Sequence, residues 1–113
     1  MEGEKKEYRV VITQSAYNSF FEIIEYLYDH YSESRAEQIS NEINSLVNSL
    51  KHYPERGVIE PRLRDRFLKH RFILFKRSSR ADVKIIYNIQ EATGTIYVTD
   101  FFPTEKDDQK ISE

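Results

Sequence analysis

The chain has 113 residues and a formal net charge of −2, with the 39% hydrophobic and 32% charged residues of an ordinary globular protein. Its length predicts a single domain over residues 1–113, with the core at about 8–102 and a polar tail at 103–113. The lack of cysteine excludes disulfides and thiolate metal sites, and no apolar run approaches the roughly 20 residues of a membrane span. Since the N-terminus also lacks an apolar signal core, we expect a cytoplasmic protein without a membrane partner.

The first half of the chain predicts one strand followed by two helices. Residues 8–12 form a short β-rich run, and Thr13 can cap the helix that follows. Ser34-x-x-Glu37 has the form of a capping box for a second helix, which we expect Pro54 to end. Two apolar stripes at helical spacing predict the buried faces: Ala16, Phe20, Ile23, Ile24, Leu27 and Tyr31, then Ala36, Ile39, Ile43, Leu46, Val47 and Leu50.

The second half predicts three strands, at residues 68–77, 83–90 and 95–102, joined by turns at 78–82 and 91–94. Gly94 suits the positive φ of the second turn. Alternation divides the middle strand into two faces: Val83, Ile85, Tyr87 and Ile89 on one, and Lys84, Ile86 and Asn88 on the other. The order β-α-α-β-β-β predicts an α+β fold, an antiparallel sheet with a helical hairpin packed on one face. The other face stays open to solvent or to a partner.

Positive charge is concentrated in residues 51–80, which hold ten Lys and Arg against three acids, a net charge of +7. The rest of the chain holds seven bases and sixteen acids, a net charge of −9. We call residues 51–80 the basic block; it predicts a surface that meets nucleic acid or an acidic partner protein. Charge alone does not distinguish between these two kinds of partner.

Other kinds of site have little support. The three histidines, His30, His52 and His70, are scattered over three elements, so we expect no metal site. The sequence also lacks a Gly-rich phosphate-binding loop, so we expect no cofactor. Several aromatic residues of the strands could stack on bases, but alternation favours the core for most of them: Phe72, Phe75, Tyr87, Tyr97, Phe101 and Phe102. Among these, Tyr87 and Tyr97 are expected to keep an exposed hydroxyl.

In order and spacing, several segments resemble the RelE/ParE toxin superfamily over roughly residues 8–108. They are ITQSA at 12–16, Leu50-x-x-Tyr53-Pro54-x-x-Gly57, VKIIYNI at 83–89, and the closing strand that ends in FFPTEK. The resemblance implies the toxin of a bacterial type II toxin–antitoxin pair, often called a plasmid stabilisation protein. It also implies growth inhibition and a hetero-oligomer with a cognate antitoxin.

Two activities occur in this superfamily, and both remain open for this chain. RelE-like members are mRNA interferases, RNA-binding proteins that cleave mRNA on the ribosome, whereas ParE-like members inhibit DNA gyrase and are not nucleases. The resemblance favours the interferase, and the gyrase inhibitor and an inactive antitoxin-binding member are the alternatives.

Metal-free RNA cleavage needs a base for the 2′-hydroxyl, fixed cations for the phosphate and an acid for the leaving oxygen. The resemblance assigns these roles to Arg71, Lys84, Tyr87 and Lys106. Two departures weaken the set: Ile73 stands where a second lysine is expected, and the tail at 103–106 holds a single cation beside Glu105. For binding RNA or the antitoxin, the candidates are in the basic block: Arg62, Arg64, Arg66, Lys69, Arg77 and Arg80.

Overall fold

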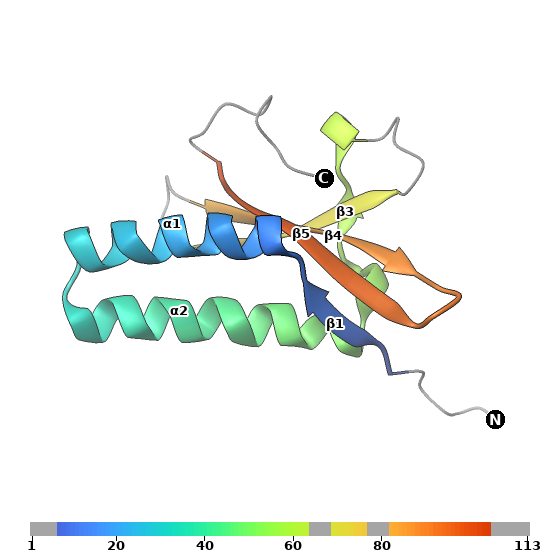
Figure 1. Cartoon of the computed structure of the whole chain (residues 1–113), viewed down its shortest axis with the longest axis horizontal. Helices are drawn as coiled ribbons and strands as arrows, with labels where there is room; N and C mark the ends of the chain where they lie inside the picture. Colours follow the sequence, from blue (N-terminus) through green and yellow to red (C-terminus); the bar gives the residue numbers. More distant parts are fainter. Residues whose placement is uncertain (1–6, 64–68, 77–81, 105–113) are drawn as a thin grey trace.

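The computed structural model describes residues 7–63, 69–76 and 82–104, and it confirms the predicted α+β class and element order. Two antiparallel helices lie on one side of a five-stranded sheet (Figure 1). The helices are α1 (Gln14–His30) and α2 (Glu33–Asn48), followed by the short 3-10 helices η1 (Ser49–Lys51), η2 (Pro54–Arg56) and η3 (Pro61–Leu63). The strands are β1 (Arg9–Ile12), β2 (Val58–Ile59), β3 (His70–Lys76), β4 (Asp82–Gln90) and β5 (Thr95–Pro103).

The sheet has the strand order β1-β5-β4-β3-β2. Strands β3, β4 and β5 form the expected antiparallel meander, and Gly94 has the expected positive φ, 63°, in the turn before β5. Two features were not predicted: β1 pairs in parallel with β5, and the two-residue β2 pairs with Arg71 and Phe72 at the opposite edge. Thr99 is an extra residue between the partners of Ile86 and Tyr87, so β5 carries a bulge there.

The helix ends differ in part from the sequence prediction. Thr13 caps α1 as predicted, its Oγ1 accepting from the Ala16 N–H at 3.1 Å. The predicted capping box at Ser34 is wrong, because Ser32 is the N-cap of α2 and accepts from the Arg35 N–H at 3.1 Å. Pro54 does not end α2, because the helix already stops at Asn48 and the chain continues as the 3-10 helix η1.

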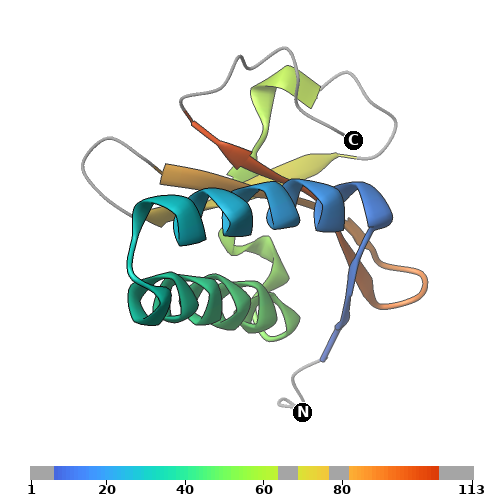
Figure 2. The same cartoon turned by 60° about the vertical axis from the view of Figure 1, so that its left-hand side comes forward.

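The helix hairpin covers one face of the sheet, which we call the helix face (Figure 2). Its core contains both predicted stripes, except that Tyr31 is 39% exposed because it lies beyond the last turn of α1. Leu46, Phe20 and Ile24 are half-buried at the margin of this core. From the sheet, the core receives Ile73, Phe75, Val83, Ile85, Tyr87, Ile96, Val98 and Phe101.

The opposite face of the sheet, here the second face, carries a smaller cluster of Leu63, Ile86 and Phe102 with half-buried Phe72 against it. The predicted division of β4 into two faces is therefore confirmed. The expected exposed hydroxyl of Tyr87 is wrong, because the whole residue is buried, and Tyr97 is half-buried. The second face is also partly covered by η3, which supplies Leu63.

Candidate functional site

Residues 54–63 wrap around the β3 edge of the sheet, and we call them the edge segment. The segment begins with η2 on the helix face, pairs with β3 through β2, and ends with η3 on the second face. Figure 2 shows this passage, with the chain after α2 below the sheet and η3 above it. The edge segment therefore contacts both faces, and most of the predicted catalytic residues bind to it.

Arg71 and Tyr87 hold the start of the edge segment on the helix face. They are cross-strand partners, so their side chains share one face. The Tyr87 hydroxyl donates to the Pro54 carbonyl at 2.6 Å and accepts from the Gly57 N–H at 3.0 Å. The Arg71 guanidinium donates to the Gly57 carbonyl at 2.7 Å. Tyr87 and Arg71, both predicted to be catalytic, therefore bind the backbone N–H and carbonyl of Gly57.

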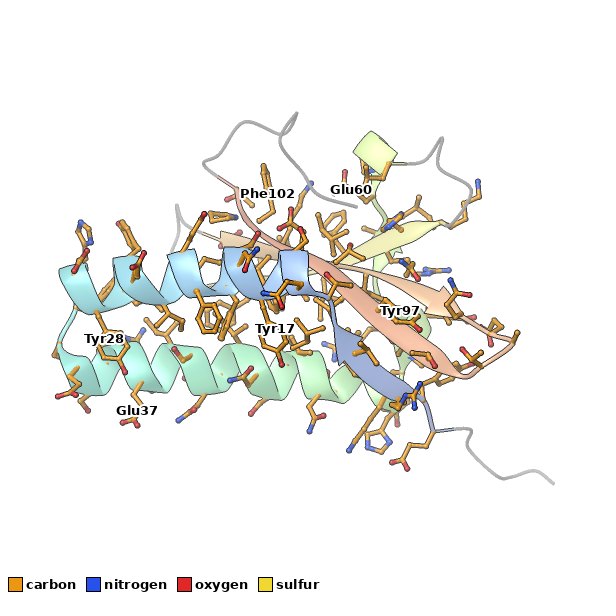
Figure 3. All side chains as sticks on the ribbon, in the orientation of Figure 1. Tyr17, Tyr28, Glu37, Glu60, Tyr97 and Phe102 are labelled. Carbon is orange, nitrogen blue, oxygen red and sulfur yellow. The ribbon has the colours of Figure 1, made fainter. Side chains whose placement is uncertain are left out.

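Lys84 holds the end of the edge segment on the second face. Its ammonium lies 2.9 Å from a carboxylate oxygen of Glu60 and 4.5 Å from the centre of the Phe72 ring. Glu60 is completely buried, and Figure 3 shows it on the side of the sheet away from the helices. A buried carboxylate needs such a partner because burial removes its hydration. Glu60 was not predicted, since a single acid between Ile59 and Pro61 gives no pattern.

The structure brings Arg71 and Tyr87 together but places Lys84 on the other face of the sheet. Lys84 pairs with Leu74 across β3 and β4, whereas Arg71 pairs with Tyr87. Ile73, at the position expected for a second lysine, is only 7% exposed and belongs to the main core. The sheet itself therefore separates the cations that one phosphate would have to contact together.

The remaining predicted residues give less information. Lys69 is exposed immediately before β3, and the backbone of Arg62 lies in η3. The others lie outside the described residues: Arg64, Arg66, Arg77, Arg80 and Lys106. Within residues 7–63, 69–76 and 82–104, no three acidic or histidine side chains group as a metal site would require.

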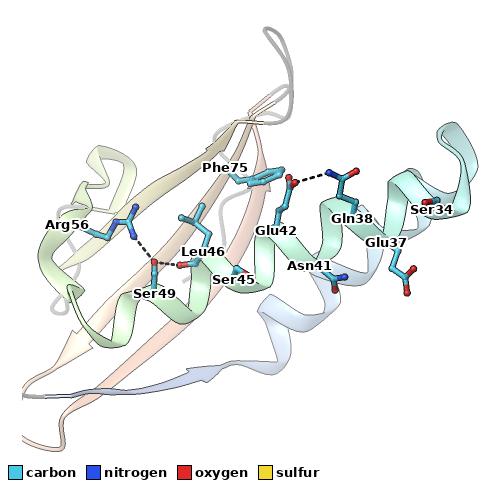
Figure 4. A pocket seen from close by; sticks show the side chains of 10 residues that line it. All are labelled: Ser34, Glu37, Gln38, Asn41, Glu42, Ser45, Leu46, Ser49, Arg56 and Phe75. Atoms are coloured by element: carbon cyan, nitrogen blue, oxygen red, sulfur yellow. Dashed lines mark hydrogen bonds between the residues drawn. The ribbon is translucent and has the colours of Figure 1, made fainter.

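An open groove of about 760 Å³ runs along α2 beside Phe75 (Figure 4). At one end Arg56 donates to the Ser49 hydroxyl at 2.6 Å, and this hydroxyl donates to the Leu46 carbonyl at 2.6 Å. These bonds attach η2 to the end of α2. Polar and charged side chains of α2, among them Glu37 and Glu42, form most of the groove lining, and none of the predicted catalytic side chains described by the structure lines it.

The two-helix hairpin on this five-stranded sheet defines an α+β toxin fold of the RelE/ParE type. Residues 10–108 match the model of the ParE toxin of the type II toxin–antitoxin system parDE, so the chain belongs to this toxin family. An antitoxin is therefore its partner. No curated protein matches the sequence significantly. None of the helices in the described part of the chain is both long and apolar enough to cross a membrane.

Replacing Tyr87 by phenylalanine should destabilise the protein by about 1–3 kcal/mol, because the half-buried Pro54 carbonyl and the buried Gly57 N–H each lose a partner. Burial raises the pKa of Tyr87, although the Gly57 N–H and the Arg71 charge partly oppose the shift. Above about pH 10 the unfolded phenol loses its proton before the folded one, so the contribution of Tyr87 to stability falls as the pH rises.

Urea unfolding of the wild type and of Tyr87→Phe at about pH 8 and about pH 11 measures both effects. The difference in stability between the two proteins should shrink at the higher pH. A constant difference would contradict the assigned role of the buried phenol.

Proposed function

We propose that this chain is a toxin that acts by binding DNA gyrase and that it does not cleave mRNA. The observation that carries the proposal is the separation of Arg71 and Tyr87 from Lys84 by the sheet. A metal-free ribonuclease must direct its base and its cations at one phosphate. Side chains on opposite faces of a sheet cannot do so.

The engagement of these side chains supports the same proposal. Arg71 and Tyr87 bind backbone groups of the edge segment, and Lys84 binds a buried carboxylate. Contact with a phosphate would require each of them to exchange an existing partner. Ile73, which stands where a second lysine was expected, is buried and uncharged, so it supplies no cation for a phosphate.

A pair of assays on the purified toxin, freed of antitoxin, tests the proposal. The toxin should stop DNA supercoiling by gyrase, and mRNA on ribosomes should stay intact. Normal supercoiling at excess toxin would reject gyrase as the target. Cleaved mRNA with 2′,3′-cyclic phosphate ends would instead indicate an mRNA interferase.

We also propose that an acidic segment of the antitoxin docks on the basic block. Among the described residues, Lys69, just before β3, and Lys76, the last residue of β3, are exposed. The double change Lys69→Glu with Lys76→Glu should weaken antitoxin binding about tenfold at low salt, and less at high salt, because exposed charges are screened. Titration calorimetry at two salt concentrations measures this, with Arg35→Glu on α2 as the control. An equal effect of the control would contradict docking at β3.

A further inference from the structure

Helix α1 carries three exposed aromatic side chains on one side. Tyr17, Phe21 and Tyr28 are 42%, 58% and 46% exposed, and spacings of four and seven residues place them in one row. The rings of Tyr17 and Phe21 are stacked, with centroids 6.2 Å apart. Figure 3 shows Tyr17 and Tyr28 projecting from the same side of α1. We call these three residues the aromatic row.

The aromatic row is not part of the core. The helix buries Ala16, Ile23 and Leu27 against the sheet and α2, while the row faces solvent along about three turns. Exposed aromatic side chains in a continuous row are typical of protein-binding surfaces, because each ring offers a large contact area with few rotatable bonds. The fold itself therefore does not account for this row.

The charge around the row limits what can bind there. The helix hairpin, residues 14–48, holds six acids and one base, a net charge of −5. Glu25 and Asp29 are exposed. They follow Phe21 along α1 at intervals of four residues, so the two acids lie beside the aromatic row. This negative surface would repel nucleic acid, an acidic antitoxin segment and a second copy of itself.

We propose that the aromatic row and its acidic border form a docking surface for a basic, amphipathic segment of a partner protein. Apolar side chains of the segment would cover the rings, Arg or Lys would pair with Glu25 and Asp29, and a guanidinium can also lie over a Tyr or Phe ring. This surface is separate from the edge segment and the basic block. The inference does not depend on gyrase being the target.

A labelled synthetic helix of about 18 residues, with leucine on one face and arginine on the other, provides the probe. Fluorescence anisotropy with the full-length protein should show binding that weakens between about 50 mM and 300 mM salt. The same peptide with glutamate in place of arginine should not bind. Failure of the basic peptide to bind, or equal binding of both peptides, would overturn the proposal.

Two sets of variants locate the binding. Phe21→Ser with Tyr28→Ser should weaken binding at least tenfold without any change of charge, and Glu25→Gln with Asp29→Asn should weaken it and reduce its salt dependence. Tyr26→Ser is the matched control, since Tyr26 is 46% exposed like Tyr28 but projects from the opposite side of α1. Undiminished binding by the aromatic variant would overturn the proposal. So would sedimentation showing a dimer that only this variant abolishes.

Discussion

Replacing Lys84 by methionine should lower the free energy of unfolding by about 3 kcal/mol. The change leaves the fully buried carboxylate of Glu60 without the ammonium that lies 2.9 Å from it. The loss is expected near the lower end of the range for broken buried pairs, because Lys84 keeps 16% of its side chain exposed. Urea unfolding of the single variant measures the loss.

The double variant Lys84→Met with Glu60→Gln is the control for this effect. Glutamine removes the buried charge but keeps the size of the side chain and an acceptor oxygen, so at least half of the lost stability should return. If the double variant is no more stable than Lys84→Met, the ion pair does not hold the edge segment as described.

The same pair of variants separates a structural role of Lys84 from a catalytic one. Loss of toxicity in Lys84→Met alone would be ambiguous, because an unfolded toxin and a disabled nuclease both permit growth. If the role of Lys84 is to hold the edge segment, expression of the double variant, whose stability is restored, should again arrest growth. If Lys84 contacts a phosphate, the double variant should fold and remain harmless.

Local patterns were sufficient to predict most of the fold. The two helical stripes identified the buried faces of α1 and α2, and alternation along β4 separated Tyr87 from Lys84. That alternation already implied that the two side chains point to opposite faces. The resemblance to a family site nevertheless grouped them, because motif spacing says nothing about which face a residue occupies.

Long-range contacts account for what the sequence did not predict. Parallel pairing of β1 with β5 joins residues far apart in the chain, and β2 is too short to produce a period. The burial of the Tyr87 hydroxyl depends on the edge segment folding over it, which brings Pro54 and Gly57 within bonding distance. Glu60 is buried for the same reason. Neither position has a local pattern that indicates a buried polar group.

Replacing Gly57 by alanine should destabilise the protein by about 3 kcal/mol, the upper end of what overpacking costs. A Cβ atom at this position would lie 2.6 Å from the Phe72 carbonyl oxygen and 2.6 Å from the Tyr87 hydroxyl. The backbone of Gly57 is extended, with φ −81°, so alanine could adopt its conformation without strain. The close approach of the edge segment to β3 is therefore what requires glycine.

A double-mutant cycle with Tyr87→Phe tests this explanation. Removing the hydroxyl eliminates one of the two clashes, so Gly57→Ala should cost less in the Tyr87→Phe background than in the wild type. The clash with the Phe72 carbonyl remains, since a backbone oxygen cannot move away without displacing β3, and the rescue should be partial. Strictly additive losses would show that Tyr87 and Gly57 are not coupled through the edge segment. Full rescue would show that β3 can shift enough to relieve the clash at the Phe72 carbonyl. In that case the Tyr87 hydroxyl alone makes glycine necessary.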